Sequence, residues 1–534
     1  MWDDNRQKAQ YNFIPLNTMA NKNTFNLGRL DIKFLTIFSF ILTITLLPFF
    51  NATVFSIDDY HLFYEGINNP STIRFSIESG RWFGIIMFKF WNLFIGNGGF
   101  SGILISYISV CVQFIFCAYI LVKSFKLNTE SWYVPIMISL GFIHVFSAEI
   151  LTFKIGLMVN IGFSFLYAIS FYSWYLMRKF DGKFLLAIIG IVLSLAAYQV
   201  IINVLIVITL LGFVLEISTY QKDEPLTIKK LKQSPFVVRL IGIILGTAVY
   251  LIANKAVLAF MGLTSSTRSQ FITLSNVDVR INQIYVLFKN ILFDANSFLI
   301  PQPIKLLFLG VICLTLFLVV ANNARKFNTV FSKILLAIGV LALVFISLLS
   351  TAISGLFLDV WWMVPRMITG FGLFTMLIFT IAFQVNTSAI IHKLLLLILI
   401  ITTVSHINLN HQIANDQAYL NYLDRSKAQR MLNNLEQIDG FKTKRLYIHQ
   451  RPDCWVNEYN IKTNVGDMNL SAFCASWSKY KILEYVAGYS ITPTNINDNL
   501  YIDSLYQTIN EHEKPIWPHK NGIWVNDSII AIFP

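Results

Sequence analysis

Charged residues are scarce in this sequence. Of its 534 residues, 13% are Asp, Glu, Lys or Arg, whereas 55% are hydrophobic. A soluble globular domain carries about 25% charged residues, so this composition excludes an ordinary water-soluble fold. The aromatic share of 15% is typical of lipid-facing surfaces and interfacial belts. The sequence therefore predicts a protein whose main solvent is lipid.

Several familiar motifs are also missing. The first 30 residues are polar, and no small-residue cleavage site follows the first apolar run, so we expect that run to remain as a signal anchor. The histidines are scattered, and no H-E-x-x-H, C-x-x-C or Asp-rich loop occurs, so no metal site is predicted. Walker and Rossmann glycine patterns are absent, so no cofactor is predicted and any donor must arrive already activated.

Apolar runs dominate what is present. A helix needs about 20 mostly apolar residues to cross a bilayer. Eleven candidate spans satisfy this roughly, at residues 34–50, 101–122, 132–147, 155–177, 184–200, 201–217, 241–262, 304–321, 334–352, 367–384 and 394–408. The sequence therefore predicts an all-α polytopic membrane protein, with a short N-terminal segment at 1–33, a membrane domain at 34–408 and a C-terminal domain at 409–534.

The positive charge follows the loops between these runs. The net charge of +12 comes from Lys and Arg residues in short clusters at alternate loops, beginning with the N-terminal segment. Cytoplasmic loops carry such an excess, so the pattern places the N-terminus in the cytoplasm and the C-terminal domain outside. The same pattern accounts for the basic residues without a nucleic-acid partner.

One apolar run departs from the spans. Residues 82–97, WFGIIMFKFWNLFIGN, are short and carry Lys89 near the centre, which favours an amphipathic helix lying on the outer interface. A twelfth span is the alternative, and it would reverse every later loop.

The C-terminal domain is polar and mixed in pattern. A helix is expected from His411, and strands are expected in KRLYIHQ and GIWVNDSIIAIF, which together predict a small α/β domain. Its two cysteines, Cys454 and Cys474, would lie in an oxidising compartment, where a disulfide persists. Two buried free cysteines are the alternative.

The first outside loop, at 51–100, contains the most conspicuous acidic cluster. Asp58 and Asp59 lie about two turns past the first span, and Glu78, Arg74 and Arg81 follow. A solvated loop explains an isolated Asp pair, but a carboxylate beside cations can act as a general base on a hydroxyl acceptor.

Cations on the same predicted face can stabilise an anionic leaving group. The candidates are Arg74, Arg81, Lys154, Arg268, Arg280 and Arg366. Arg366 begins a span beside Trp361 and Trp362, which suits either an interfacial anchor in an aromatic belt or a phosphate clamp, because guanidinium binds phosphate in a bidentate way.

Two short links add further polar residues. Glu149 lies five residues before Lys154, and a local ion pair explains both as well as a substrate contact does. Tyr198 and Gln199, in the AAYQV turn between two apolar runs, are candidates for side chains that face a cavity.

The order SIDDYH, then ESGRW about twenty residues later, then AAYQ and VPRM, resembles the Gtr-type O-antigen glucosyltransferases of the GT-C class. The resemblance covers roughly residues 30–410. It implies transfer of glucose, or a similar sugar, from polyprenyl phosphate to a lipopolysaccharide glycan on the periplasmic face of the bacterial inner membrane.

The resemblance also implies roles for single residues. Asp58 or Asp59 would be the base of an inverting transfer, and Arg366, Arg81 and Arg74 would bind the donor phosphate. The residues that would contact substrate are Glu78, Glu149, Lys154, Tyr198, Gln199, Trp361 and Trp362. A small flippase and a donor-making glycosyltransferase are implied partners. The rival classes are a lipid-linked glycan transporter or flippase, and an O-antigen polymerase.

Overall fold

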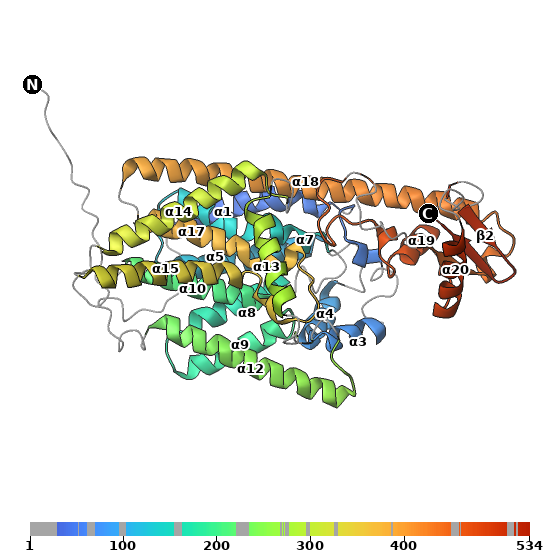
Figure 1. Cartoon of the computed structure of the whole chain (residues 1–534), viewed down its shortest axis with the longest axis horizontal. Coiled ribbons are helices and arrows are strands. Elements are labelled where there is room, and N and C mark those ends of the chain that lie inside the picture. The colour runs from blue at the N-terminus through green and yellow to red at the C-terminus, as the bar shows by residue number, and fades with distance from the viewer. Residues whose placement is uncertain are drawn as a thin grey trace, which may run out of the picture.

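A computed structural model gives the fold of most of the chain. It describes residues 29–51, 53–60, 70–95, 103–153, 163–219, 234–266, 270, 272, 277–294, 299–324, 329–385, 388–449, 459, 461–509, 517–518 and 522–533. The described part is mainly helical, with a helical bundle at one end and a small mixed domain at the other (Figure 1).

Eight helices among the described residues are long and apolar enough to cross a membrane. They are α1 (Arg29–Leu46) continued by η1 (Leu47–Phe50), α5 (Ile103–Phe125), α10 (Ile201–Thr219), α12 (Pro235–Met261), α14 (Gln302–Ala324), α15 (Val330–Ser350), α17 (Gly370–Val385) preceded by η7 (Pro365–Ile368), and α18 (Ala389–Leu435). Each overlaps one of the predicted runs, which supports a membrane protein.

The count of eleven spans is not confirmed. The run at 132–147 is broken at His144 into α6 (Tyr133–Ile143) and the pair η3 (Val145–Ser147) and α7 (Ala148–Thr152), with a bend of 41°. His144 leaves the helical conformation, and its ring accepts a hydrogen bond from the Phe146 N–H. The helices α8 (Phe163–Leu176) and α9 (Gly182–Leu195) have 14 described residues each, fewer than the roughly 20 that a span needs.

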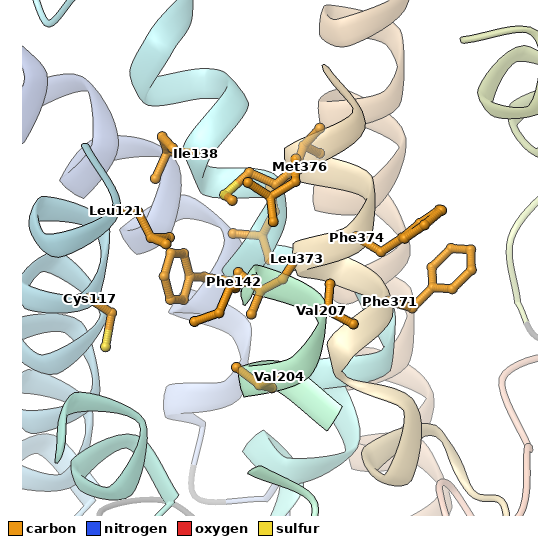
Figure 2. Close-up of a cluster of buried hydrophobic side chains, with 14 of the residues drawn as sticks. Cys117, Leu121, Ile138, Phe142, Val204, Val207, Phe371, Leu373, Phe374 and Met376 are labelled. Atoms are coloured by element: carbon orange, nitrogen blue, oxygen red, sulfur yellow. The ribbon is translucent and has the colours of Figure 1, made fainter. Parts of the chain in front are cut away.

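α17 lies at the centre of the bundle, where it packs against α6, α10 and α14. Figure 2 shows the apolar side chains of α5, α6, α10 and α17 gathered into one cluster. Glycines let α6 and α17 approach closely. A Cβ on Gly141 would lie 2.8 Å from Leu373 Cδ2, and one on Gly372 would lie 2.8 Å from His144 Cβ. This close approach fixes the start of α17 beside the break at His144.

Three shorter helices lie at the end of the bundle nearest the C-terminal domain. They are α3 (Pro70–Glu78), α4 (Trp82–Ile95) and α13 (Val277–Leu292). α13 runs across the long helices in Figure 1. The helix predicted at 82–97 is therefore present as α4; its position at a membrane interface stays a prediction.

α18 runs across the expected boundary at residue 408. Its 47 residues run without a break from the bundle into the C-terminal domain. The helix expected from His411 is therefore the second half of the same helix whose first half is the last predicted span. Figure 1 shows α18 projecting beyond the bundle to carry the C-terminal domain. The composition changes at this point because the helix leaves the apolar bundle, and composition alone does not reveal that the backbone continues.

The C-terminal domain has the predicted α/β character. β1 (Arg445–Ile448) pairs in parallel with β3 (Ile529–Ile532), and β2 (Ile523–Val525) pairs antiparallel with β3, so the sheet order is β1-β3-β2. The helices η8 (Phe441–Thr443), η9 (Ala472–Cys474), α19 (Lys479–Ala487) and α20 (Ile496–Thr508) complete it. The stretch GIWVNDSIIAIF is thus a hairpin of two strands.

The described cysteines are of two kinds. Cys111, Cys117 and Cys313 are free, and all three lie on apolar helices. Cys474 is disulfide-bonded. Cys454, its predicted partner, lies outside the described residues, so the pairing itself stays a prediction.

Candidate active site

Arg366 is the centre of a buried ionic cluster. One nitrogen of its guanidinium, Nη1, pairs with Glu149 Oε1, and Nη2 lies 2.8 Å from Asp467 Oδ2. The backbone N–H of Arg366 donates to Glu149 Oε2 at 2.8 Å. The three side chains are 15%, 1% and 13% exposed. Charges this deeply buried require partners, and here each carboxylate meets the same guanidinium.

The fold brings Glu149 and Arg366 together across 217 residues. Glu149 lies on α7, directly after the break at His144, and Arg366 lies on η7, directly before α17. η3 and α7 both pack against η7, so the bend in one apolar run faces the start of another. Arg366 is therefore not an interfacial anchor pointing to solvent, and Glu149 pairs with it. Lys154, the expected local partner of Glu149, lies outside the described residues.

The AAYQ and ESGRW motifs form a second part of the site. Gln199 Nε2 donates to the Ser79 carbonyl at 2.7 Å and to the Tyr250 hydroxyl at 2.9 Å. The Tyr250 hydroxyl in turn donates to the Gly80 carbonyl at 3.2 Å. Gly80 has a φ of +76°, and a Cβ there would lie 2.4 Å from the Tyr250 oxygen. Only glycine fits this turn, which fixes Arg81 beside the AAYQ motif.

Arg81 and Tyr198 connect the two parts. The Arg81 guanidinium carbon lies 5.1 Å from the centre of the Tyr198 ring, a cation–π contact. Tyr198 is close enough to Arg366, Arg81 and Glu149 for all three charges to act on its phenol. Arg81, Arg366 and Glu149 therefore surround the half-buried Tyr198, and Asp467 joins the cluster through Arg366.

Asn203, which sequence reasoning did not select, supports this arrangement. Its Nδ2 donates to the carbonyls of Thr351 at 3.0 Å and Met367 at 2.7 Å, and its Oδ1 accepts from the Ser354 N–H at 2.9 Å. The side chain thus ties α10 to the segment that carries Arg366. The sequence signal that could have identified Asn203 is its polar side chain inside the apolar run 201–217.

Asp58 and Asp59 have different surroundings. Asp59 is 1% exposed, and its Oδ2 accepts from the backbone N–H of Ser56 at 2.8 Å and from the Ser56 hydroxyl at 3.3 Å. This contact closes the first turn of a helix, as in a capping box. Asp58 is partly exposed, and its Oδ1 accepts from Trp477 Nε1 at 2.8 Å. Of the two carboxylates, Asp58 is the one at a surface.

Other predicted residues have contacts of their own or lie outside the described part of the chain. Arg74 is 67% exposed, and its Nε lies 2.8 Å from Glu78 Oε1 in an i,i+4 pair on α3. Arg280 lies over the Trp361 ring at 4.9 Å and donates to the carbonyls of Gly355, Leu358 and Asp359. Trp362 has a buried indole nitrogen. Arg268 lies outside the described residues.

The charged side chains of the candidate site can provide acid–base and electrostatic catalysis. Asp58 presents a carboxylate near the surface, and Arg81 and Arg366 present guanidinium groups. Within the described residues, no group of three or more His, Cys, Asp or Glu side chains is placed to hold a metal ion. A carboxylate base and a cation that stabilises developing negative charge suit group-transfer chemistry.

The chain was also compared with known proteins. Comparison with curated proteins and with solved structures finds no match. A family model described as glucosyl transferase GtrII matches residues 47–381, a range that includes both sequence motifs of the first loop, the AAYQ turn and Arg366. The resemblance drawn from those motifs is thereby confirmed, and the chain belongs to the GtrII family of glucosyl transferases.

Proposed function

We propose that this protein transfers glucose from polyprenyl phosphate to an O-antigen or lipopolysaccharide glycan, with inversion, on the periplasmic face of the bacterial inner membrane. Membership of a glucosyl transferase family supports the sugar and the reaction class. The apolar helices support a lipid-linked donor, because they provide surfaces for a polyprenyl chain. The alternation of basic loops supports a cytoplasmic N-terminus and a periplasmic C-terminal domain.

Asp58 is the residue we assign as general base. Its carboxylate takes the proton of the acceptor hydroxyl as that oxygen attacks the anomeric carbon from the face opposite the phosphate. The bond between the anomeric carbon and the phosphate oxygen breaks, and polyprenyl phosphate departs with the bonding electrons. The single observation that carries this assignment is the difference in burial and contacts between Asp58 and Asp59.

Arg81 is the cation we assign to the leaving phosphate. The donor phosphodiester carries one negative charge and the released phosphate carries up to two, so a nearby cation lowers the barrier. Arg366 was expected to act as the phosphate clamp. Both of its Nη atoms already pair with carboxylates, those of Glu149 and Asp467, so we assign it to organising these two side chains. Arg74 is too exposed to contribute much to binding the phosphate or to organising the carboxylates.

The proposed partners are membrane-bound. A donor-making glycosyltransferase must attach the sugar to polyprenyl phosphate, because no nucleotide-binding pattern occurs in this sequence. A small flippase would deliver that donor to the periplasmic face.

A turnover assay in detergent micelles separates transfer from transport. The purified protein would be given glucosyl polyprenyl phosphate and a lipopolysaccharide acceptor from a strain that lacks this protein. We expect one new glycosidic bond for each polyprenyl phosphate released, with inverted anomeric configuration by NMR. A flippase has no membrane to cross in micelles, so unchanged donor there, together with donor movement across vesicles, would contradict the proposal.

A further inference from the structure

The C-terminal domain places a loop directly on the Arg366 cluster. Val465 and Met468 exchange backbone hydrogen bonds of 3.2 and 3.1 Å, which closes a tight turn with Gly466 and Asp467 at its tip. Gly466 has a φ of +61°, and a Cβ there would lie 2.6 Å from Val364 Cγ1. The turn therefore presses against the residue two positions before Arg366, and only glycine permits that contact.

The same loop is anchored to the bundle and to α18. Met468 is 1% exposed and packs in the core of the membrane domain. Asn469 Nδ2 donates to the Ile413 carbonyl at 3.1 Å, and the Thr463 hydroxyl donates to Asp416 Oδ2 at 2.8 Å. These contacts hold Asp467 in place, so its position over Arg366 is built into the fold.

The two oxygens of Asp467 differ. Oδ2 accepts from Arg366 Nη2 at 2.8 Å. Oδ1 is buried, and no donor among the described residues reaches it. Buried carboxylate oxygens in native proteins nearly always accept hydrogen bonds, because leaving one unpaired is costly. Oδ1 thus points to a donor supplied by a bound molecule.

We propose that Asp467 is a substrate-binding residue whose Oδ1 accepts a hydrogen bond from a hydroxyl of the glucose being transferred. This inference rests on the proposed function. A carboxylate repels phosphate but accepts readily from a hydroxyl, which identifies the sugar as the contacted part of the donor. Asp467 pairs with Arg366, and Arg366 and Arg81 both lie close to Tyr198. Because Arg81 is the cation assigned to the leaving phosphate, the sugar bonded to that phosphate lies beside the same cluster.

Asp467 also lies outside residues 47–381, the range that matches the family model. The C-terminal domain therefore adds a sugar contact to a site that the membrane domain otherwise provides. Such a residue would select among hexoses, because a site built to bind a hydroxyl discriminates strongly against a sugar that lacks it.

Deoxy sugars test the contact directly. Wild type, Asp467→Ala and the control Asp527→Ala, which changes an exposed residue of the β2–β3 turn, would be assayed with glucosyl polyprenyl phosphate and its 2-, 3-, 4- and 6-deoxy analogues. We expect wild type and Asp527→Ala to lose at least tenfold in kcat/KM with one analogue. Asp467→Ala should be slower with glucose but should lose less than threefold with that same analogue.

A uniform loss for all five donors in Asp467→Ala would assign Asp467 a merely structural role and overturn the inference, as would an unaffected variant. The rise in thermal midpoint of the detergent-solubilised protein on adding each of the same donors measures donor binding, and so tests the contact without turnover. If wild type distinguishes the deoxy donors in binding but transfers no sugar, the proposed function fails and the contact stands. If Asp467→Ala retains the wild-type binding preference, the inference fails whether or not sugar is transferred.

Discussion

At the scale of single residues, the two Nη atoms of Arg366 have separate tasks. Nη1 pairs with Glu149 of the bundle, and Nη2 pairs with Asp467 of the C-terminal domain. A lysine at this position keeps the charge but has no planar fork with which to reach both carboxylates.

We therefore expect Arg366→Lys to lower sugar transfer by about 10- to 100-fold, because one charged hydrogen bond in a buried cluster is worth about 1.5–3 kcal/mol. The measurement is the initial rate of glucose transfer by purified protein. Arg74→Lys, in an exposed i,i+4 pair, is the matched control and should stay close to wild type. A normal rate in Arg366→Lys would show that the double contact has no role in turnover.

The sequence indicated only part of the candidate site. Its motifs pointed to Arg81, Tyr198 and Arg366, which the structure brings together. Asp467 could not be found in this way, because 101 residues separate it from Arg366 and its turn belongs to a polar domain with many similar residues. The division of labour between Asp58 and Asp59 depends on which carboxylate closes the helix turn after Ser56, and adjacent identical residues do not reveal that.

At the scale of elements, α13 holds the segment that leads to Arg366. Arg280 is 6% exposed and donates to three carbonyls between residues 355 and 359 at 2.7–2.9 Å. One side chain thus satisfies backbone groups that α16 (Ile353–Phe357) and the following loop leave unpaired. It ties a helix that crosses the bundle to the approach of η7.

Arg280→Met should therefore loosen this segment, since a buried carbonyl without a donor costs about 1–3 kcal/mol and Gly355 is buried. We expect a lower thermal midpoint in detergent and faster proteolysis near residue 358, together with slower transfer. Lys289→Met, an exposed change on the same helix, provides the comparison and should leave all three unchanged. Equal behaviour of the two variants would mean that Arg280 does not hold the loop.

Apolar length predicted most helices but not their ends. Runs near 20 residues correspond to α1, α5, α10, α12, α14, α15 and α17 because burial in lipid and helix formation require the same composition. Apolar length does not predict the break at His144 or the continuation of α18 beyond residue 408. Both depend on packing: Gly372 lies against His144, and the second half of α18 is stabilised by the C-terminal domain.

At the scale of the whole molecule, α18 joins the bundle to the domain that covers the candidate site. Asp467 and Trp477 reach Arg366 and Asp58 from that domain. This arrangement requires the C-terminal domain and the first loop to lie on the same side of the membrane.

Cysteine labelling tests the sidedness. Single cysteines replacing Ser504 on α20 and Lys179 between α8 and α9, both exposed, would be placed in a parent whose Cys111, Cys117 and Cys313 are replaced by Ala. We expect an impermeant thiol reagent to label the Ser504 variant on intact spheroplasts and the Lys179 variant only after lysis, since the basic loops are assigned to the cytoplasm. Labelling of the Lys179 variant from outside would reverse the topology.

The most direct test of the catalytic assignment compares the adjacent carboxylates of Asp58 and Asp59. Asp58→Asn and Asp59→Asn would each be purified, checked for a monodisperse fold by size-exclusion chromatography, and assayed for initial rate with glucosyl polyprenyl phosphate. We expect Asp58→Asn to lose at least about 100-fold in rate, the usual contribution of a general base. Asp59→Asn should stay within a few-fold of wild type, because an amide oxygen can still accept the Ser56 N–H. A rate above half of wild type in Asp58→Asn would contradict the assignment of this site as the centre of sugar transfer.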